Sequence, residues 1–185
     1  MNGETTAPNT RPCTLQNTEL TLIRTAVPPT VPLSPLTPPE GRVADYLVRG
    51  LTPAEIAAEL DRSLSTTHRH LRFLRYKTRC PTRCPLPVLV HRLLTSHGVA
   101  APATGLPVPD LDTGEMKLLR ALAEEITRSG RATTAGLRPR DLATALDALL
   151  GKTGAATATQ LVGLAHSWKL LPTEQDHTKR KGASQ

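Results

Sequence analysis

The segment Leu51–Lys77 constrains the fold most, because it carries the signals of two short helices separated by a tight turn. Thr52, followed by Pro53 and then by Glu55, is typical of a helix that starts with a capping box. After a short polar turn, Ser63 is a second helix-capping residue. The second helix has apolar or small side chains at helical spacing, namely Leu64, Thr67, Leu71 and Leu74. Two packed helices of this kind form a helix-turn-helix.

The opposite face of the second helix is basic, since it carries His68, Arg69, Arg72 and Arg75. Residues 63–100 contain no Asp or Glu, whereas they contain seven Lys or Arg. A solvated basic helix face is common, but so long a segment of one sign repels itself and favours a polyanionic partner. We therefore expect the second helix to bind double-stranded DNA in the major groove.

Aromatic residues are scarce, with one Trp, one Phe and two Tyr in 185 residues. Cores must therefore be built from Leu, Val, Ile and Ala, and strand-like alternating runs are missing, so we predict an all-α fold. The net charge of +7 suits a polyanionic partner but does not identify one. The abundance of Ala, Arg, Thr and Pro suggests a high-GC bacterial genome.

The apolar pattern repeats without a gap after a shift of 75 residues. Matched pairs include Glu40 and Glu115, Leu47 and Leu122, Lys77 and Lys152, and His91 and His166. An ungapped register over about 60 residues indicates a tandem duplication of a four-helix unit. The second copy is degenerate: its equivalent of the basic helix, expected at 138–149, has Ala143, Thr144 and Asp147 on the outer face.

Composition divides the chain into five parts. We expect a disordered Pro-rich arm at 1–34, a helix-turn-helix DNA-binding domain at 35–97, a linker at 98–110, a second helix-turn-helix repeat at 111–171 and a basic polar tail at 172–185. The fourth helix of each repeat is more apolar than a small four-helix core requires. These helices are expected to pair, either within one chain or between two chains as a homodimer.

Four motifs in the first repeat carry a resemblance to a known family. They are Leu36-Thr-Pro-x-Glu40, Gly50-Leu-Thr-x-x-Glu-Ile-Ala-x-x-Leu60, Ser63-x-x-Thr66-x-x-x-His70 and Leu74-x-x-Lys77. With these motifs, residues 35–97 resemble the DNA-binding domain of the LuxR/NarL (GerE-type) transcription regulators. The resemblance implies a four-helix fold whose third helix enters the major groove and whose fourth helix commonly dimerises. The sequence departs from the family pattern at Asp61, Thr67 and Thr78, where a turn glycine and two aliphatic residues are usual.

The resemblance and the basic helix face together define eight candidate DNA-binding residues. They are Ser63, Ser65, Thr66, His68, Arg69, Arg72, Arg75 and Lys77. The resemblance also implies a partly buried position for His70. The predicted function is a sequence-specific DNA-binding transcriptional regulator. Two alternatives remain: a protein–protein adaptor that binds RNA polymerase or another regulator, and a module similar to sigma region four.

We expect no enzymatic activity, no cofactor and no metal, because phosphate-binding loops and nucleophile motifs are missing. The three cysteines, Cys13, Cys80 and Cys84, would need His91 and His97 to complete a zinc site, so free structural thiols are expected. No apolar run approaches the roughly 20 residues of a membrane span, and no signal-peptide pattern is present. A cytoplasmic location without a membrane partner is therefore expected.

Overall fold

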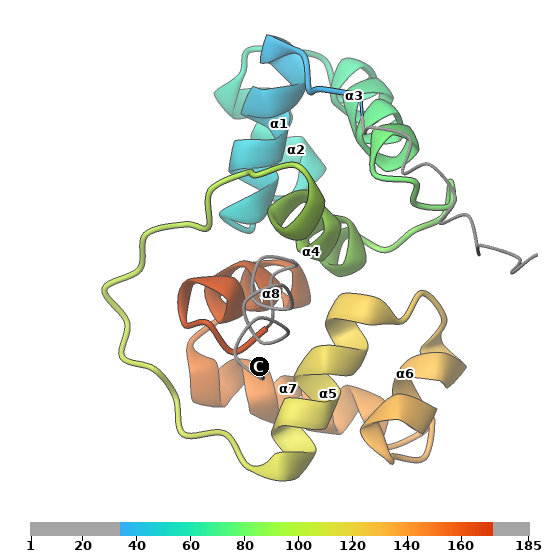
Figure 1. Cartoon of the computed structure of the whole chain (residues 1–185), viewed down its shortest axis with the longest axis vertical. Helices are drawn as coiled ribbons and strands as arrows, with labels where there is room; N and C mark the ends of the chain where they lie inside the picture. The colour runs from blue at the N-terminus through green and yellow to red at the C-terminus, as the bar shows by residue number, and fades with distance from the viewer. Residues whose placement is uncertain (1–33, 172–185) are drawn as a thin grey trace, which may run out of the picture. The chain divides into compact units, whose positions relative to one another are not determined.

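The computed structural model of the chain describes residues 34–171, which form eight α-helices with no β-strand among them (Figure 1). The helices are α1 (Pro38–Val48), α2 (Pro53–Glu59), α3 (Leu64–Lys77), α4 (Leu86–Ser96), α5 (Thr113–Glu124), α6 (Arg128–Ala135), α7 (Leu142–Thr153) and α8 (Ala158–Ser167). The predicted all-α fold is confirmed for this part of the chain, and none of its helices is long and apolar enough to cross a bilayer. The predicted tail at 172–185 and the predicted arm at 1–34, apart from Ser34, lie outside the described residues.

Capping residues explain where α2 and α3 begin. The Thr52 N–H donates to Glu55 Oε2 over 2.7 Å, and the Glu55 N–H donates to Thr52 Oγ1 over 3.3 Å. At the start of α3, Ser63 Oγ accepts the N–H of Thr66 at 3.1 Å. Each contact pairs an amide that the helix itself leaves without a partner. The predicted starts of these two helices are confirmed.

The start of α7 corrects the prediction from the repeat. The equivalent of α3 was expected from Arg138, but α7 begins at Leu142. Arg138 occupies the position of Ser63, and its guanidinium cannot accept a hydrogen bond from a backbone amide. Instead, Arg138 O accepts the Asp141 N–H at 2.9 Å in a turn, and Arg138 Nε lies 2.6 Å from Asp141 Oδ2.

The backbone repeats the unusual conformations of the first half in the second half. Asp61 after α2 has φ of 49°, and Gly136, 75 residues later, has φ of 70°. Arg79 after α3 has φ of 54°, and Gly154, also 75 residues later, has φ of 68°. Left-handed residues end helices and suit glycine best. The second copy therefore uses glycine where the first copy uses residues with a side chain.

The two halves share one hydrophobic core, and α4 packs against α8 (Figure 1). His91 on α4 and His166 on α8 meet there, with His91 Nδ1 2.9 Å from His166 Nε2. The backbone of α8 also approaches the end of α1, because a Cβ added at Gly163 would lie only 2.2 Å from Val48 O. Glycine is therefore required by close approach at this contact.

The segment between α4 and α5 is fastened to the end of α8. Ser167 Oγ donates to Pro102 O over 2.5 Å, and the buried Trp168 donates its Nε1–H to Leu106 O over 3.2 Å. These hydrogen bonds come from residues more than 60 positions apart in sequence. The connecting segment therefore contributes to the packing of the second half.

Candidate nucleic-acid interface

The exposed face of α3 presents three of the candidate residues to solvent: His68, Arg69 and Arg72. Phe73 and Tyr76 lie on the same helix and are 42% and 80% exposed. The buried side of α3 consists of Thr67, Leu71 and Leu74. Because α3 has no acidic residue, the positive charge of its outer face is not neutralised within the helix.

Three further candidates form a hydroxyl cluster at the start of α3. Ser63 Oγ lies 2.9 Å from Ser65 Oγ and 2.8 Å from Thr66 Oγ1. Ser63 and Ser65 are exposed, and Thr66 is half-buried. The first turn of a helix directs backbone N–H groups and the positive end of the helix dipole toward solvent. Hydroxyl groups at that position can hydrogen-bond phosphate oxygens.

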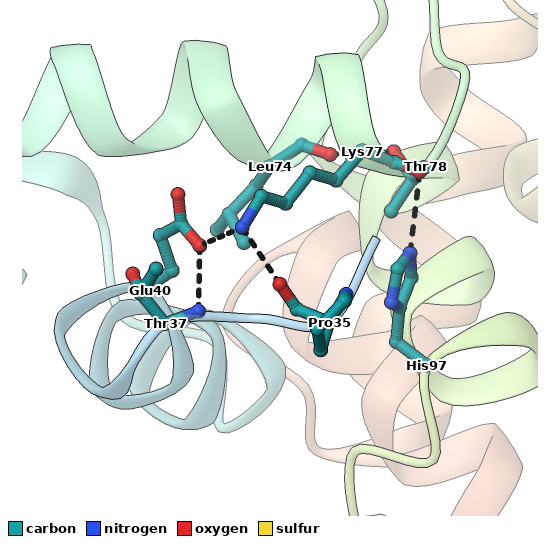
Figure 2. Close-up of polar contacts among 7 residues, drawn as sticks. All are labelled: Pro35, Thr37, Glu40, Leu74, Lys77, Thr78 and His97. Atoms are coloured by element: carbon teal, nitrogen blue, oxygen red, sulfur yellow. Dashed lines mark hydrogen bonds and ion pairs between the residues drawn. The ribbon is translucent and has the colours of Figure 1, made fainter. Parts of the chain in front are cut away.

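The last two candidates, Arg75 and Lys77, hold the end of α3 in place. Arg75 is half-buried and donates from Nε to Cys84 O over 3.1 Å. Lys77 Nζ donates to Glu40 Oε2 over 2.6 Å and to Pro35 O over 2.7 Å (Figure 2). Only 15% of the Lys77 side chain is exposed. Its charge is therefore directed at α1 and away from the basic outer face.

Glu40 is the buried acceptor of this network and also caps α1. Its Oε2 accepts the Thr37 N–H at 2.8 Å in addition to the Lys77 ammonium (Figure 2). Burial alone would raise the pKa of the Glu40 carboxyl, but the hydrogen bonds from Lys77 and Thr37 outweigh burial and lower it. The carboxylate is thus ionised at neutral pH and ties α1 to α3.

A hollow of about 300 Å³ lies beside the first half of α3, and we call it the cationic hollow. It is lined by Pro39, Arg42, Val43, Leu60, Arg62, Thr66, Thr67, Arg69 and His70, with no acidic residue among them. Three arginines thus converge from α1, from the turn after α2 and from α3. Sequence reasoning included Arg69 but missed Arg42 and Arg62. No local sequence signal could have joined them, because packing between α1 and α3 brings them together.

The second half has a corresponding hollow of about 280 Å³, which we call the acidic hollow. It is lined by Asp112, Gly114, Glu115, Leu118, Ala135, Leu137, Ala145, Ala148 and Leu149. Five of these residues lie 75 positions after residues that line the cationic hollow. No Lys or Arg lines the acidic hollow, so the two related hollows differ in the sign of their charge. On the adjacent α7, Ala143, Thr144 and Asp147 are exposed.

Cysteine and histidine side chains do not gather into a metal site within residues 34–171. Cys80 and Cys84 are free thiols that lie together between α3 and α4. Of the histidines considered as ligands, His91 contacts His166, and His97 Nε2 lies 3.4 Å from Lys77 O (Figure 2).

No family model matches the chain, and comparisons with curated proteins and with solved structures give no match either. Function is therefore inferred from the geometry and the charge of the described residues.

Proposed function

We propose that this chain is a sequence-specific DNA-binding transcription regulator composed of two tandem helix-turn-helix units. In this proposal α3 enters the major groove, as the second helix of such a motif does. The observation that carries the proposal is the contrast between the two hollows. The cationic hollow adjoins an acid-free helix with exposed arginines, whereas the acidic hollow adjoins a helix without them.

The residues around α3 divide between phosphate contact and base reading. Arg42 and Arg62 flank the start of α3 and, with the hydroxyl cluster, suit the phosphates at the edge of the groove. Arg69 and Arg72 are exposed on α3 itself, where a guanidinium can donate two hydrogen bonds to guanine. Phosphate contacts supply most of the affinity and make it dependent on salt. Lys77 supports α3 through Glu40 and is not expected to touch DNA.

The packing of α4 against α8 suggests how the units are used. The resemblance implies pairing of two chains through their fourth helices, and here the corresponding helices of one chain contact each other. We infer that one chain takes the place of a dimer, with one unit that reads DNA and one that does not. Such a protein binds an asymmetric site and not a palindrome.

A second candidate function is an adaptor that binds another protein. It is favoured by the exposure of Phe73 and Tyr76 on α3, because exposed aromatic side chains are enriched at protein interfaces. The same helix cannot serve both roles at once, and a DNA-binding measurement distinguishes them.

The test uses DNA duplexes that the full chain selects from a random pool, with binding measured by gel shift at several salt concentrations. Arg42→Gln is compared with Lys117→Gln, which changes the exposed residue 75 positions later. Loss of one phosphate contact reduces the slope of log affinity against log salt by about 0.9. We expect this reduction for Arg42→Gln and an unchanged slope for Lys117→Gln.

Charge reversal gives a second comparison in the same assay. Arg69→Glu should lower affinity more than Arg140→Glu, because Arg140 lies 3.7 Å from Asp141 and outside the acid-free segment. Failure to select any duplex, or equal losses for both variants, would overturn the assignment of α3 as the reader.

A further inference from the structure

The segment between α3 and α4 holds a pair of thiols that the proposed DNA interface does not use. Cys80 Sγ and Cys84 Sγ lie 2.9 Å apart, and both cysteines are free. Cys80 is 8% exposed and Cys84 is 1% exposed. A disulfide bond is about 2.05 Å long, so the two sulfurs need to approach by only about 0.9 Å to bond. The fold therefore holds the thiols ready to join.

The two thiols differ in their hydrogen bonding and electrostatics. The Cys84 S–H donates to Cys80 Sγ. This hydrogen bond is the main cause that lowers the pKa of the Cys80 thiol to about 6, with help from Thr78, Arg92 and Arg75, against burial. The same hydrogen bond, together with burial, raises the pKa of the Cys84 thiol. Cys80 is thus the thiolate, and Cys84 keeps its proton.

Cys80 is also the thiol that a small molecule can reach. It lines a surface hollow of about 470 Å³, whose other residues are Arg72, Phe73, Arg75, Tyr76, Lys77 and Thr82. Cys84 does not line this hollow. A small oxidant that enters from solvent therefore meets the nucleophilic sulfur first, with the protonated thiol behind it.

We propose that Cys80 and Cys84 form a redox-active dithiol that a hydroperoxide such as hydrogen peroxide converts to a disulfide. The Cys80 thiolate attacks one peroxide oxygen, and the O–O bond breaks. Cys80 becomes a sulfenic acid, and the released hydroxide takes a proton to become water. Cys84 then attacks the Cys80 sulfur, the S–O bond breaks, and a second water leaves with the Cys84 proton. Two thiols lose two electrons, and one peroxide is reduced to two waters.

Each side of the pair is anchored to α3. The Cys80 N–H donates to Arg75 O over 2.8 Å, and Arg75 Nε donates to Cys84 O over 3.1 Å. Arg92 of α4 donates to Thr78 O over 3.3 Å at the same turn. Movement of the sulfurs on oxidation therefore acts on the last turn of α3. The dithiol itself does not depend on the DNA-binding proposal.

The experiment uses the full chain with Cys13→Ser, which leaves Cys80 and Cys84 as its only thiols. Hydrogen peroxide should remove both maleimide-reactive thiols and lower the mass by two hydrogens, and dithiothreitol should restore both. In a Cys13→Ser/Cys84→Ser chain, peroxide should give a sulfenic acid at Cys80 that dimedone traps. A Cys13→Ser/Cys80→Ser chain should give far less adduct at the same peroxide dose.

A measurement without core substitutions guards against variants that fail to fold. Substoichiometric iodoacetamide on the Cys13→Ser chain should alkylate Cys80 first, and the rate should be half-maximal near pH 6. Both thiols remaining free after peroxide would overturn the proposal. Preferential alkylation of Cys84 would also overturn it.

Discussion

The ion pair between α1 and α3 can be tested against its own counterpart in the second half. Lys77 lies 2.6 Å from Glu40, and Lys152, 75 positions later, lies 2.7 Å from Glu115. The exposed fractions of the lysine and glutamate side chains are 15% and 7% in the first pair, but 42% and 24% in the second. Two pairs of equal length therefore differ mainly in burial. Lys77→Met and Lys152→Met isolate that difference.

The magnitude follows from what Lys77→Met leaves behind. Glu40 remains buried with the Thr37 N–H as its printed donor, and removing one partner of a buried pair costs about 3–5 kcal/mol. Because Lys77 is partly exposed and Met keeps the apolar stem, we expect a loss of about 2–4 kcal/mol in the free energy of unfolding. For a chain of this size the melting temperature falls by about 2–4 °C per kcal/mol. Lys152→Met should cause a much smaller loss, since water already solvates that pair.

The assay is urea unfolding of the full chain, followed by far-UV circular dichroism. A carboxyl whose pKa is lowered in the folded state stabilises the protein above its unfolded pKa, and this stability is lost as pH falls. The difference between wild type and Lys77→Met should therefore shrink below about pH 4.5. Combining Lys77→Met with Glu40→Leu should recover much of the loss, because no unpaired charge remains buried. Equal losses for Lys77→Met and Lys152→Met would refute the reasoning from burial.

Three further predictions concern stability. Gly163→Ala should lower the free energy of unfolding by about 1–3 kcal/mol through its clash with α1, whereas Gly151→Ala, in open space on α7, should raise it by about 0.5–1 kcal/mol; equal effects in urea titrations would contradict the close contact. Asp61→Gly should raise the unfolding midpoint by relieving its positive φ, by about 0.5 kcal/mol, and a lower midpoint would count against that strain. Burial lowers the pKa of both His91 and His166, the latter to about 4, so stability should fall by about 1–2 kcal/mol between pH 7 and pH 5, and His166→Leu should flatten that dependence.

Signals confined to a few neighbouring residues predicted much of the helical structure. The capping boxes and Pro residues marked the starts of α1 and α2, because an N-cap acts through hydrogen bonds within one turn. The same rule explains the failure at α7. The repeat pattern carried the start of α3 over to Arg138, but it did not account for the loss of the Ser63 hydroxyl.

The site could be predicted only in part, because its assembly depends on contacts between distant segments. Helical spacing placed Arg69 and Arg72 on an exposed face of α3. It could not show that Lys77 turns toward Glu40, which lies 37 positions earlier in the chain. Nor could it join Arg42 to the cationic hollow, because packing of α1 on α3 creates that hollow.

The covalent link between the two halves has a consequence for gene dosage. A regulator that must dimerise before it binds loses occupancy steeply when only a few copies are present, because dimer concentration falls with the square of monomer concentration. Here α4 meets α8 within one chain, across a connecting segment that is itself hydrogen-bonded to Ser167 and Trp168. The effective concentration of one half around the other is set by the tether and does not change on dilution. Occupancy of a DNA site should then follow the first power of protein concentration, down to very low copy number.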